Sequence, residues 1–302
     1  MITGIHFLLT YSCTYECDHC FLFCSPWTRG TFTRDQLRRV FDEIARLPEI
    51  EEVYFEGGEP FLYYPLLLEG LRMAGGLGLR AGIVTNCYWA TTASDAEVWL
   101  TPIHDIGIAD LSVSDDAFHR ELDAENCAAN AAAAARSLGI PCDSICIQPP
   151  DSAPEATRGG KPVTGGRVLF KGRAAEKLTA GLPRRPRQEL TTCPHEDLRD
   201  PGRVHADSFG NVHLCQGISM GNMWQTPLSE LIRDWDAARH PVCGPLAAGG
   251  PDALAREHGL DLGDDFVDEC HYCYTVRKAL LSRFPEHLAP PSVYGLSASS
   301  SK

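Results

Sequence analysis

This chain of 302 residues has no run of eighteen consecutive apolar residues, so a membrane-spanning helix is not expected. Its start lacks a basic segment followed by an apolar stretch, which argues against a secretion signal. Basic residues are few, at 27 Lys and Arg against 40 Asp and Glu, and the formal net charge is -13. Phosphate binding needs a positive face, so nucleic acid is an unexpected partner. We therefore expect a cytoplasmic protein whose charged partner, if it has one, is a cation.

Cysteine is abundant, and its pattern is informative. The thirteen cysteines are an odd number, which argues against a complete set of disulfides. Several are separated by only two residues, and in a cytosolic chain of this size such pairs indicate a metal site. The hydrophobic content of 44% is enough for a real core, in one large domain or in one large and one small domain.

Short β-branched runs alternate with helical patterns through the first half, which is typical of a parallel sheet with crossover helices. The expected strands are 4–10, 52–56, 80–85, 109–114, 142–148 and 167–171, and the expected helices are 33–47, 65–74, 95–100 and 125–138. The sequence therefore predicts an α/β fold, a partial (β/α)6 barrel. Three stretches are rich in proline together with glycine or serine. They predict a long loop at the barrel mouth (149–166), a domain boundary (181–188) and a disordered tail (290–302).

A cysteine cluster follows the first expected strand directly. Cys13, Cys17 and Cys20 have a Cys-x3-Cys-x2-Cys spacing. Three thiolates on one loop can hold three irons of a [4Fe–4S] cube and leave the fourth iron open for an outside ligand. The alternative is a zinc site, which would need His19 or Cys24 as its fourth ligand.

After the second expected strand comes the turn Gly57-Gly58-Glu59-Pro60. The cysteine cluster and this turn, in this order, resemble the motifs of the radical S-adenosylmethionine (SAM) enzyme superfamily. The resemblance implies a partial barrel, a [4Fe–4S] cluster on the three cysteines and SAM on the open iron, with residues 57–60 against the methionine amino group. In that family, reduction of the cluster cleaves SAM to a 5′-deoxyadenosyl radical that takes hydrogen from the substrate.

The resemblance also implies further SAM contacts. His19 stands where the family has an aromatic residue near adenine, and Ser112 and Ser114 fall in the segment that contacts the ribose. Gln148 and Arg173 are placed to meet adenine or the methionine carboxylate. Gln148 and Arg173 also fit a simpler role as strand-end caps.

The second half carries another cysteine set. Cys215 ends an expected hairpin strand, and Cys270 and Cys273 share one turn at the start of a helix, with Cys193 upstream. Four thiolates can close one iron–sulfur cluster or one zinc site. The pattern resembles the twitch domain, a shortened SPASM domain, which implies a second [4Fe–4S] cluster in a small α+β domain. The interval from Cys193 to Gly210 is longer than is usual there. The expected division is a barrel (1–182), an auxiliary domain (183–285) and a tail (286–302).

One of the remaining cysteines is a candidate catalytic group. Cys243 lies between prolines, in an expected loop between ligand-bearing segments. A thiol in such a place can return hydrogen to a carbon radical, as in radical SAM epimerases. Cys87, after the third strand, is the competing candidate. Both also fit an inert thiol, and Cys243 fits an extra cluster ligand.

The resemblance is compatible with several reactions. The favoured expectation is an epimerase of the neomycin type, acting on a sugar carbon of a cationic aminoglycoside. The support is a spare thiol, an acidic protein with carboxylates such as Glu16, Asp115 and Asp116, and no peptide-binding extension. Alternatives are a dehydrogenase of an amino-sugar alcohol, a peptide-modifying enzyme, and a non-enzymatic electron-transfer or zinc protein. The enzyme would also need an electron donor such as flavodoxin or ferredoxin.

Overall fold

The computed structural model of the protein describes residues 1–119, 126–150 and 168–296. Its mixed α/β fold, with a mostly parallel sheet, confirms the predicted class. The main strands are β1 (Gly4–Thr10), β2 (Glu52–Gly57), β3 (Arg80–Thr85), β4 (Asp110–Ser114), β5 (Cys142–Ile145), β7 (Arg203–Asp207), β8 (Asn211–Cys215) and β9 (Ile218–Asn222). They form one sheet in the order β5-β4-β3-β2-β1-β7-β8-β9. The short strands β6 (Arg185–Pro186) and β10 (Asp265–Phe266) pair separately.

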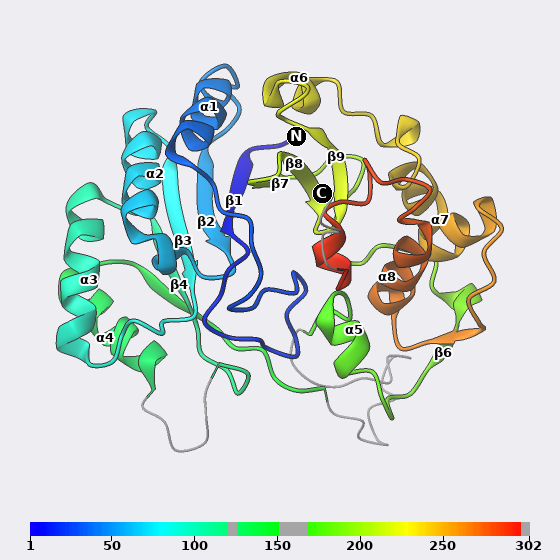
Figure 1. Ribbon diagram of the computed structural model, residues 1–302, viewed down its shortest axis with the longest axis horizontal. Coiled ribbons are helices and arrows are strands. Elements are labelled where there is room, and N and C mark those ends of the chain that lie inside the picture. Colours follow the sequence, from blue (N-terminus) through cyan, green and yellow to red (C-terminus); the bar gives the residue numbers. More distant parts are fainter. Residues whose placement is uncertain (120–125, 151–167, 297–302) are drawn as a thin grey trace.

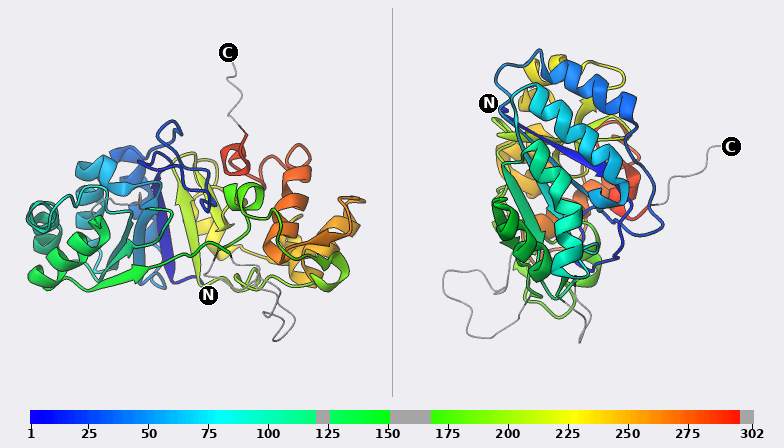
Figure 2. Two further views of the ribbon diagram at one scale, coloured as in Figure 1. Left: turned by 90° about the horizontal axis from the view of Figure 1, so that it is seen from below. Right: turned by 90° about the vertical axis from the view of Figure 1, so that its left-hand side faces the viewer.

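The α-helices are α1 (Arg34–Ile44), α2 (Tyr64–Gly76), α3 (Ala93–Ile106), α4 (Cys127–Leu138), α5 (Arg173–Lys177), α6 (Leu228–Arg233), α7 (Cys243–Glu257) and α8 (Glu269–Leu280). Shorter 3-10 turns are η1 (Pro60–Tyr63), η2 (Arg187–Glu189), η3 (Ala237–Arg239) and η4 (Pro291–Tyr294). Helices α1 to α4 lie beside strands β1 to β4, whereas α7 and α8 lie beyond β9 (Figures 1 and 2). The sheet thus runs between two groups of helices.

Strand β1 is central, and its two faces differ. Phe7 is fully buried and stacks on Phe41 of α1 and Phe55 of β2, at ring-centroid distances of 5.2 Å each. Because side chains alternate along a strand, His6 and Leu8 point to the opposite face, the interior of the partial barrel. Burial of the aromatic face fixes the strand register, and that register sends the polar residues inward.

Helix starts follow their capping residues. Thr33 caps α1: its side chain accepts from Gln36 N, and the Gln36 side chain accepts from Thr33 N, which is a capping box. Asn126 caps α4 in the same way through Ala129 N. All four predicted helices begin within two residues of the observed ones, whereas the third, predicted over 95–100, continues to Ile106.

The predicted sixth strand is wrong over 168–171, its described part. Lys171 N donates to Leu169 O at 2.7 Å, a three-residue turn that an extended strand cannot make. Gly172 follows with a φ of +60°. On its other edge β1 pairs in parallel with β7, and β8 and β9 continue the sheet antiparallel. The division near residue 182 therefore separates two parts of one sheet.

The chain end is more ordered than its composition predicts. Tyr294, in η4, is fully buried, and its hydroxyl donates to Gly217 O at 2.6 Å. Arg277 of α8 packs over its ring. The expected disorder is therefore wrong for 290–296, where the buried side chains of Val293 and Tyr294 anchor the segment. Residues 297–302 and most of the predicted mouth loop (151–166) lie outside the described residues.

Candidate functional site

A cavity of about 290 Å³ opens at the carboxyl ends of the parallel strands. All three cysteines of the N-terminal cluster line it, as do the turn after β2 and the ends of β3 to β5. The cysteine loop is held at both ends, by Cys13 N donating to Ser25 O and by Cys20 N donating to Cys17 O, each at 3.1 Å. In an α/β barrel, the strand carboxyl ends are where binding sites form.

Arg173 fixes the outer side of this loop. Its guanidinium donates to the carbonyl oxygens of Cys17 at 2.6 Å and Cys24 at 2.9 Å, and its backbone N donates to Cys20 O at 2.9 Å. Only 5% of the residue is exposed. Arg173 does not line the cavity within the described residues. The structure therefore places it on the cysteine loop backbone, in a positioning role.

The two glycines of the turn after β2 line the cavity, but they also pack against the cysteine loop. A Cβ on Gly58 would lie 2.1 Å from Ser12 O, and one on Gly57 would lie 2.5 Å from Thr10 O. Gly57 also has a φ of +124°, which disfavours any side chain. Close approach of backbone to backbone thus requires glycine at both positions, directly before Cys13.

Glu59 and Pro60 of the same turn are buried and lie behind the cavity. The Glu59 carboxylate accepts from Thr85 Oγ1 at 2.9 Å and from Asn86 N at 2.7 Å. Burial raises the pKa of Glu59 to about 7. Its described contacts tie the β2 turn to the end of β3, so it braces the site.

Asn86 is a site residue that the sequence reasoning missed. Its amide nitrogen donates to Cys13 Sγ at 3.4 Å and to Thr14 Oγ1 at 3.1 Å, and the residue lines the cavity. The available signal was its position directly after β3, where strand ends converge on one site.

Only some of the other predicted SAM-contacting residues line the cavity. His19 and Ser114 line the cavity. Burial lowers the pKa of His19 to about 4. Ser112 shares the inward face of β4 with Ser114, but its hydroxyl donates to Asp110 at 2.8 Å. Gln148 is exposed, beyond the end of β5.

A histidine–aspartate pair stands beside His19 and was not predicted as a unit. His119 lines the cavity, and its Nδ1 lies 2.8 Å from Asp116 Oδ1. Asp116 is 1% exposed and also accepts from the backbone of Phe118 and Ile147. These bonds hold the pKa of the Asp116 carboxyl below its ordinary value against the opposing effect of burial. The carboxylate thus orients the His119 ring at the cavity wall.

The four cysteines of the second half come together. They line one cavity with two cationic side chains, Lys171 and Arg277. Cys215 ends β8, Cys270 and Cys273 begin α8, and Asp268 caps that helix through His271 N. Lys171 Nζ lies 3.3 Å from Cys215 Sγ. The thiols that the sequence groups thus share one pocket, next to buried positive charge.

Neither candidate hydrogen donor lines the first cavity. Cys243 is not in a loop, as predicted, but begins α7, because His240 Nδ1 accepts from Val242 N at 3.2 Å and Cys243 N at 3.0 Å. It is fully buried, and its charged neighbours are auxiliary-site groups, including Cys215 and Cys273. Cys87 is also fully buried, with its Sγ 3.7 Å from Thr85 O.

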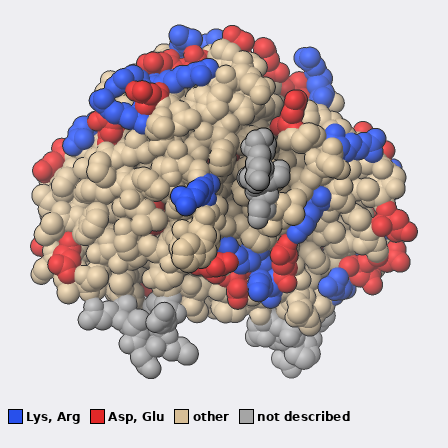
Figure 3. Space-filling model, viewed as in Figure 1, with Lys and Arg blue, Asp and Glu red and all other residues tan. Residues whose placement is uncertain are grey.

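Surface charge does not single out one partner. Basic and acidic side chains are interspersed on the face shown in Figure 3. Glu16, one of the acids considered for amine binding, lies 3.8 Å from the Arg173 guanidinium. Across the described residues, no helix combines the length and apolar character needed to cross a membrane.

Comparisons with known proteins give distant similarities. No protein family model matches the chain. Over 107 residues it is 24% identical to YydG of Bacillus subtilis (strain 168), a candidate peptide biosynthesis protein, and the match covers 35% of this chain and 34% of YydG. The chain thus spans about a third of the length of this curated relative.

Solved structures are similarly distant. BtrN in complex with AdoMet and 2-DOIA aligns at a TM-score of 0.49 and 15% identity, over 76% of this chain and 82% of BtrN. Streptococcus suis SuiB bound to S-adenosylmethionine aligns at a TM-score of 0.38 and 10% identity, over 78% of this chain and 66% of SuiB.

Proposed function

We propose that this protein is a radical SAM enzyme. The observation that carries the proposal is that Cys13, Cys17 and Cys20 line one cavity with Gly57 and Gly58 at the strand carboxyl ends. When bound, a [4Fe–4S] cluster and SAM would supply a 5′-deoxyadenosyl radical that abstracts hydrogen from the substrate. The chain's own part is to hold the cysteine loop, through Arg173, Asn86 and the backbone contacts of the β2 turn.

The spacing of the thiols supports a cluster over zinc. Four thiolates on one zinc ion, at about 2.3 Å each, lie about 3.8 Å from one another. Among the described residues, which include all thirteen cysteines, no three thiols lie within 4.8 Å of one another. A cube holds its thiolates on different irons and therefore farther apart. The same argument supports a second [4Fe–4S] cluster on Cys193, Cys215, Cys270 and Cys273.

For the reaction itself, we propose oxidation of an alcohol carbon on a small cationic substrate, of the amino-sugar class. After hydrogen abstraction, this reaction requires a base for the hydroxyl proton and an acceptor for one electron. His119, oriented by Asp116 at the cavity wall, is placed to take the proton. When bound, the auxiliary cluster would supply the electron acceptor, and the net charge of -13 favours a cationic substrate.

Two buried cations favour electron acceptance at the second site. Lys171 contacts Cys215 Sγ at 3.3 Å, and Arg277 lines the same cavity and is 1% exposed. Positive charge in a poorly solvated region stabilises an added negative charge. The epimerase reaction favoured by the sequence would instead need a thiol at the substrate. Cys243 reaches that role only if α7 moves, because its thiol is sealed in the core.

The enzyme class is tested by SAM cleavage. The protein is reconstituted with iron and sulfide without oxygen, then given SAM and dithionite, and 5′-deoxyadenosine is measured. We expect cleavage by the wild type and by the control variant Cys127→Ala, and at least a hundredfold loss in Cys17→Ala. An iron-loaded wild type that leaves SAM intact would refute the proposal.

The reaction type is tested with candidate amino sugars in deuterium oxide. Oxidation gives a product that lacks two hydrogens and carries no solvent deuterium at the reacting carbon, and Cys243→Ala retains product formation. Epimerisation gives a product of unchanged composition that carries one deuterium, and Cys243→Ala would lose the product but keep 5′-deoxyadenosine. The second pattern would refute the proposed oxidation and support epimerisation.

A further inference from the structure

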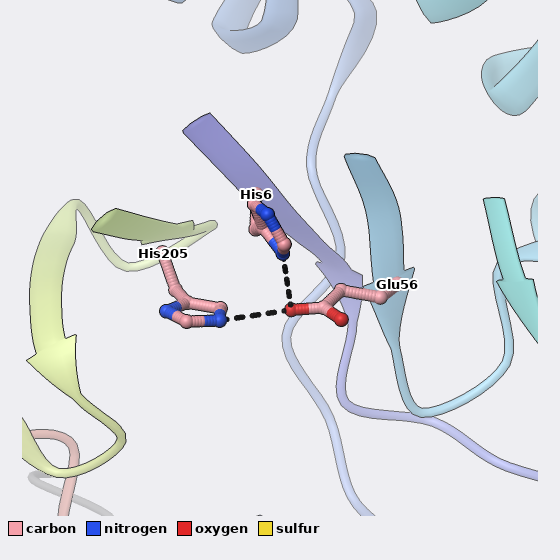
Figure 4. Close-up of side chains that lie close together, drawn as sticks. All are labelled: His6, Glu56 and His205. Atoms are coloured by element: carbon pink, nitrogen blue, oxygen red, sulfur yellow. Dashed lines mark ion pairs between the residues drawn. The ribbon is translucent and has the colours of Figure 1, made fainter. Parts of the chain in front are cut away.

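Three potential metal ligands converge on the interior face of the sheet, beside the cavity. His6 comes from β1, Glu56 from β2 and His205 from β7, and their side chains point toward one another (Figure 4). The register pairs His6 directly with His205 and places Glu56 one inward position farther along β2. Glu56 also lines the cavity that holds the cysteine loop.

The distances match those between neighbouring ligands of one ion. Glu56 Oε1 lies 3.1 Å from His205 Nε2 and 3.4 Å from His6 Nδ1, and all three ligand atoms are within 4.8 Å of one another. With metal–ligand bonds of about 2.1 Å, adjacent ligands lie about 3.0 Å apart at octahedral angles and about 3.4 Å apart at tetrahedral angles. Two of the three separations therefore match those between neighbouring ligands of one ion.

The hydrogen bond from Gln216 leaves no proton between His205 Nε2 and the Glu56 carboxylate. Lys171 Nζ can only donate, and it lies 2.7 Å from Gln216 Oε1, which turns the Gln216 amide nitrogen toward His205 Nε2 at 3.2 Å. A donor facing this nitrogen requires a lone pair on it. With its lone pair accepting from Gln216, His205 Nε2 carries no proton for the Glu56 carboxylate oxygen 3.1 Å away, and a bound ion would need that lone pair in place of the Gln216 donor. His6 Nδ1 is buried and faces the Glu56 carboxylate at 3.4 Å.

We propose that His6, Glu56 and His205 bind one divalent first-row transition-metal ion, separate from both cysteine sites. Two imidazoles and one carboxylate suit zinc or ferrous iron and leave coordination positions open. Because Glu56 lines the cavity, the ion is accessible from it, and a hydroxyl or amino group of a bound molecule can complete its coordination. Ion binding at His205 Nε2 would displace the Gln216 amide from that nitrogen, because one lone pair cannot hold both a proton donor and an ion. This proposal does not rest on the proposed reaction.

Zinc is the probe. Reconstituted enzyme with both cysteine sites loaded is equilibrated without oxygen in a zinc buffer, and zinc, iron and sulfide are counted per chain. We expect one zinc per chain in the wild type and at least a tenfold weaker zinc affinity in His6→Gln, Glu56→Gln and His205→Gln, at unchanged iron content. Gln216→Leu should retain zinc binding, because it removes a donor that competes with the ion for the lone pair of His205 Nε2.

Two matched controls make the result specific. His119→Gln, in the neighbouring His19–Asp116–His119 cluster, and His104→Gln, on the surface, should bind zinc as the wild type does. The proposal is overturned if the wild type binds no zinc at unchanged iron content, or if the three ligand variants retain wild-type affinity. A loss of zinc in His119→Gln alone would move the site to the other cluster and also overturn it. Since three independent variants are used, misfolding of one leaves the test intact.

Discussion

Replacing Arg173 by Met should release the cysteine loop while preserving much of the side chain's bulk. The guanidinium donates two hydrogen bonds, to Cys17 O and Cys24 O, from a side chain that is almost completely buried. Hydrogen bonds from a charged donor contribute about 1.5–3 kcal/mol each, so their loss amounts to about 3–6 kcal/mol of loop stability. Since each 1.4 kcal/mol is a factor of ten, the population of open loop should rise at least about a hundredfold.

The assay is the rate at which a reconstituted enzyme loses iron to a chelator, followed without oxygen. Iron from the N-terminal cluster should leave about a hundredfold faster in Arg173→Met, while the auxiliary iron leaves at the wild-type rate. Arg34→Met is the matched control, because Arg34 is 61% exposed and pairs with Glu69 at the surface. If Arg173→Met retains iron normally and only weakens SAM binding, the positioning role is refuted and a direct SAM contact is supported.

Three further predictions follow from other contacts. Gly58→Ala should destabilise the fold by about 1–3 kcal/mol and lower iron content, because its Cβ meets Ser12 O; normal thermal stability would contradict this. Glu59 has a folded pKa of about 7 against an ordinary 4.5, so the folded state binds the extra proton and stability should fall as pH rises from about 5 to 7. Glu59→Gln should flatten that slope in thermal unfolding, and an unchanged slope would assign it to another group. Tyr294→Phe should lose about 0.5–1.5 kcal/mol in denaturant unfolding, because Gly217 O loses its donor; no loss would mean that water replaces the hydroxyl.

Periodicity carried most of the fold prediction. The alternation of β-branched runs with helical patterns placed β1 to β5 and the starts of α1 to α4, because those signals are local in the chain. The predicted sixth strand failed because the turn at Leu169–Lys171 is set by distant partners of Lys171, namely Cys215 and Gln216. Residue spacing does not encode such long-range contacts.

The same distinction between local signals and long-range contacts applies to the candidate site. Cys13, Cys17 and Cys20 could be grouped from spacing because they lie on one loop, whereas the second cysteine set, spread over residues 193–273, was grouped by its resemblance to the twitch domain. The triad of His6, Glu56 and His205 could not be predicted from spacing, because its members are separated by long stretches of chain and meet only through strand pairing. Cys243 was expected in a loop because its prolines suggested one, whereas His240 caps a helix there.

The pairing of β1 with β7 also bears on how the chain is made. During synthesis, β1 emerges first, but the strand that covers its second edge is completed only at Asp207. Until then, the central strand of the sheet presents unpaired backbone groups, which are a template for aggregation. A fragment ending at residue 182 would keep that edge permanently, so the two halves of this chain are expected to depend on each other for solubility as well as for chemistry.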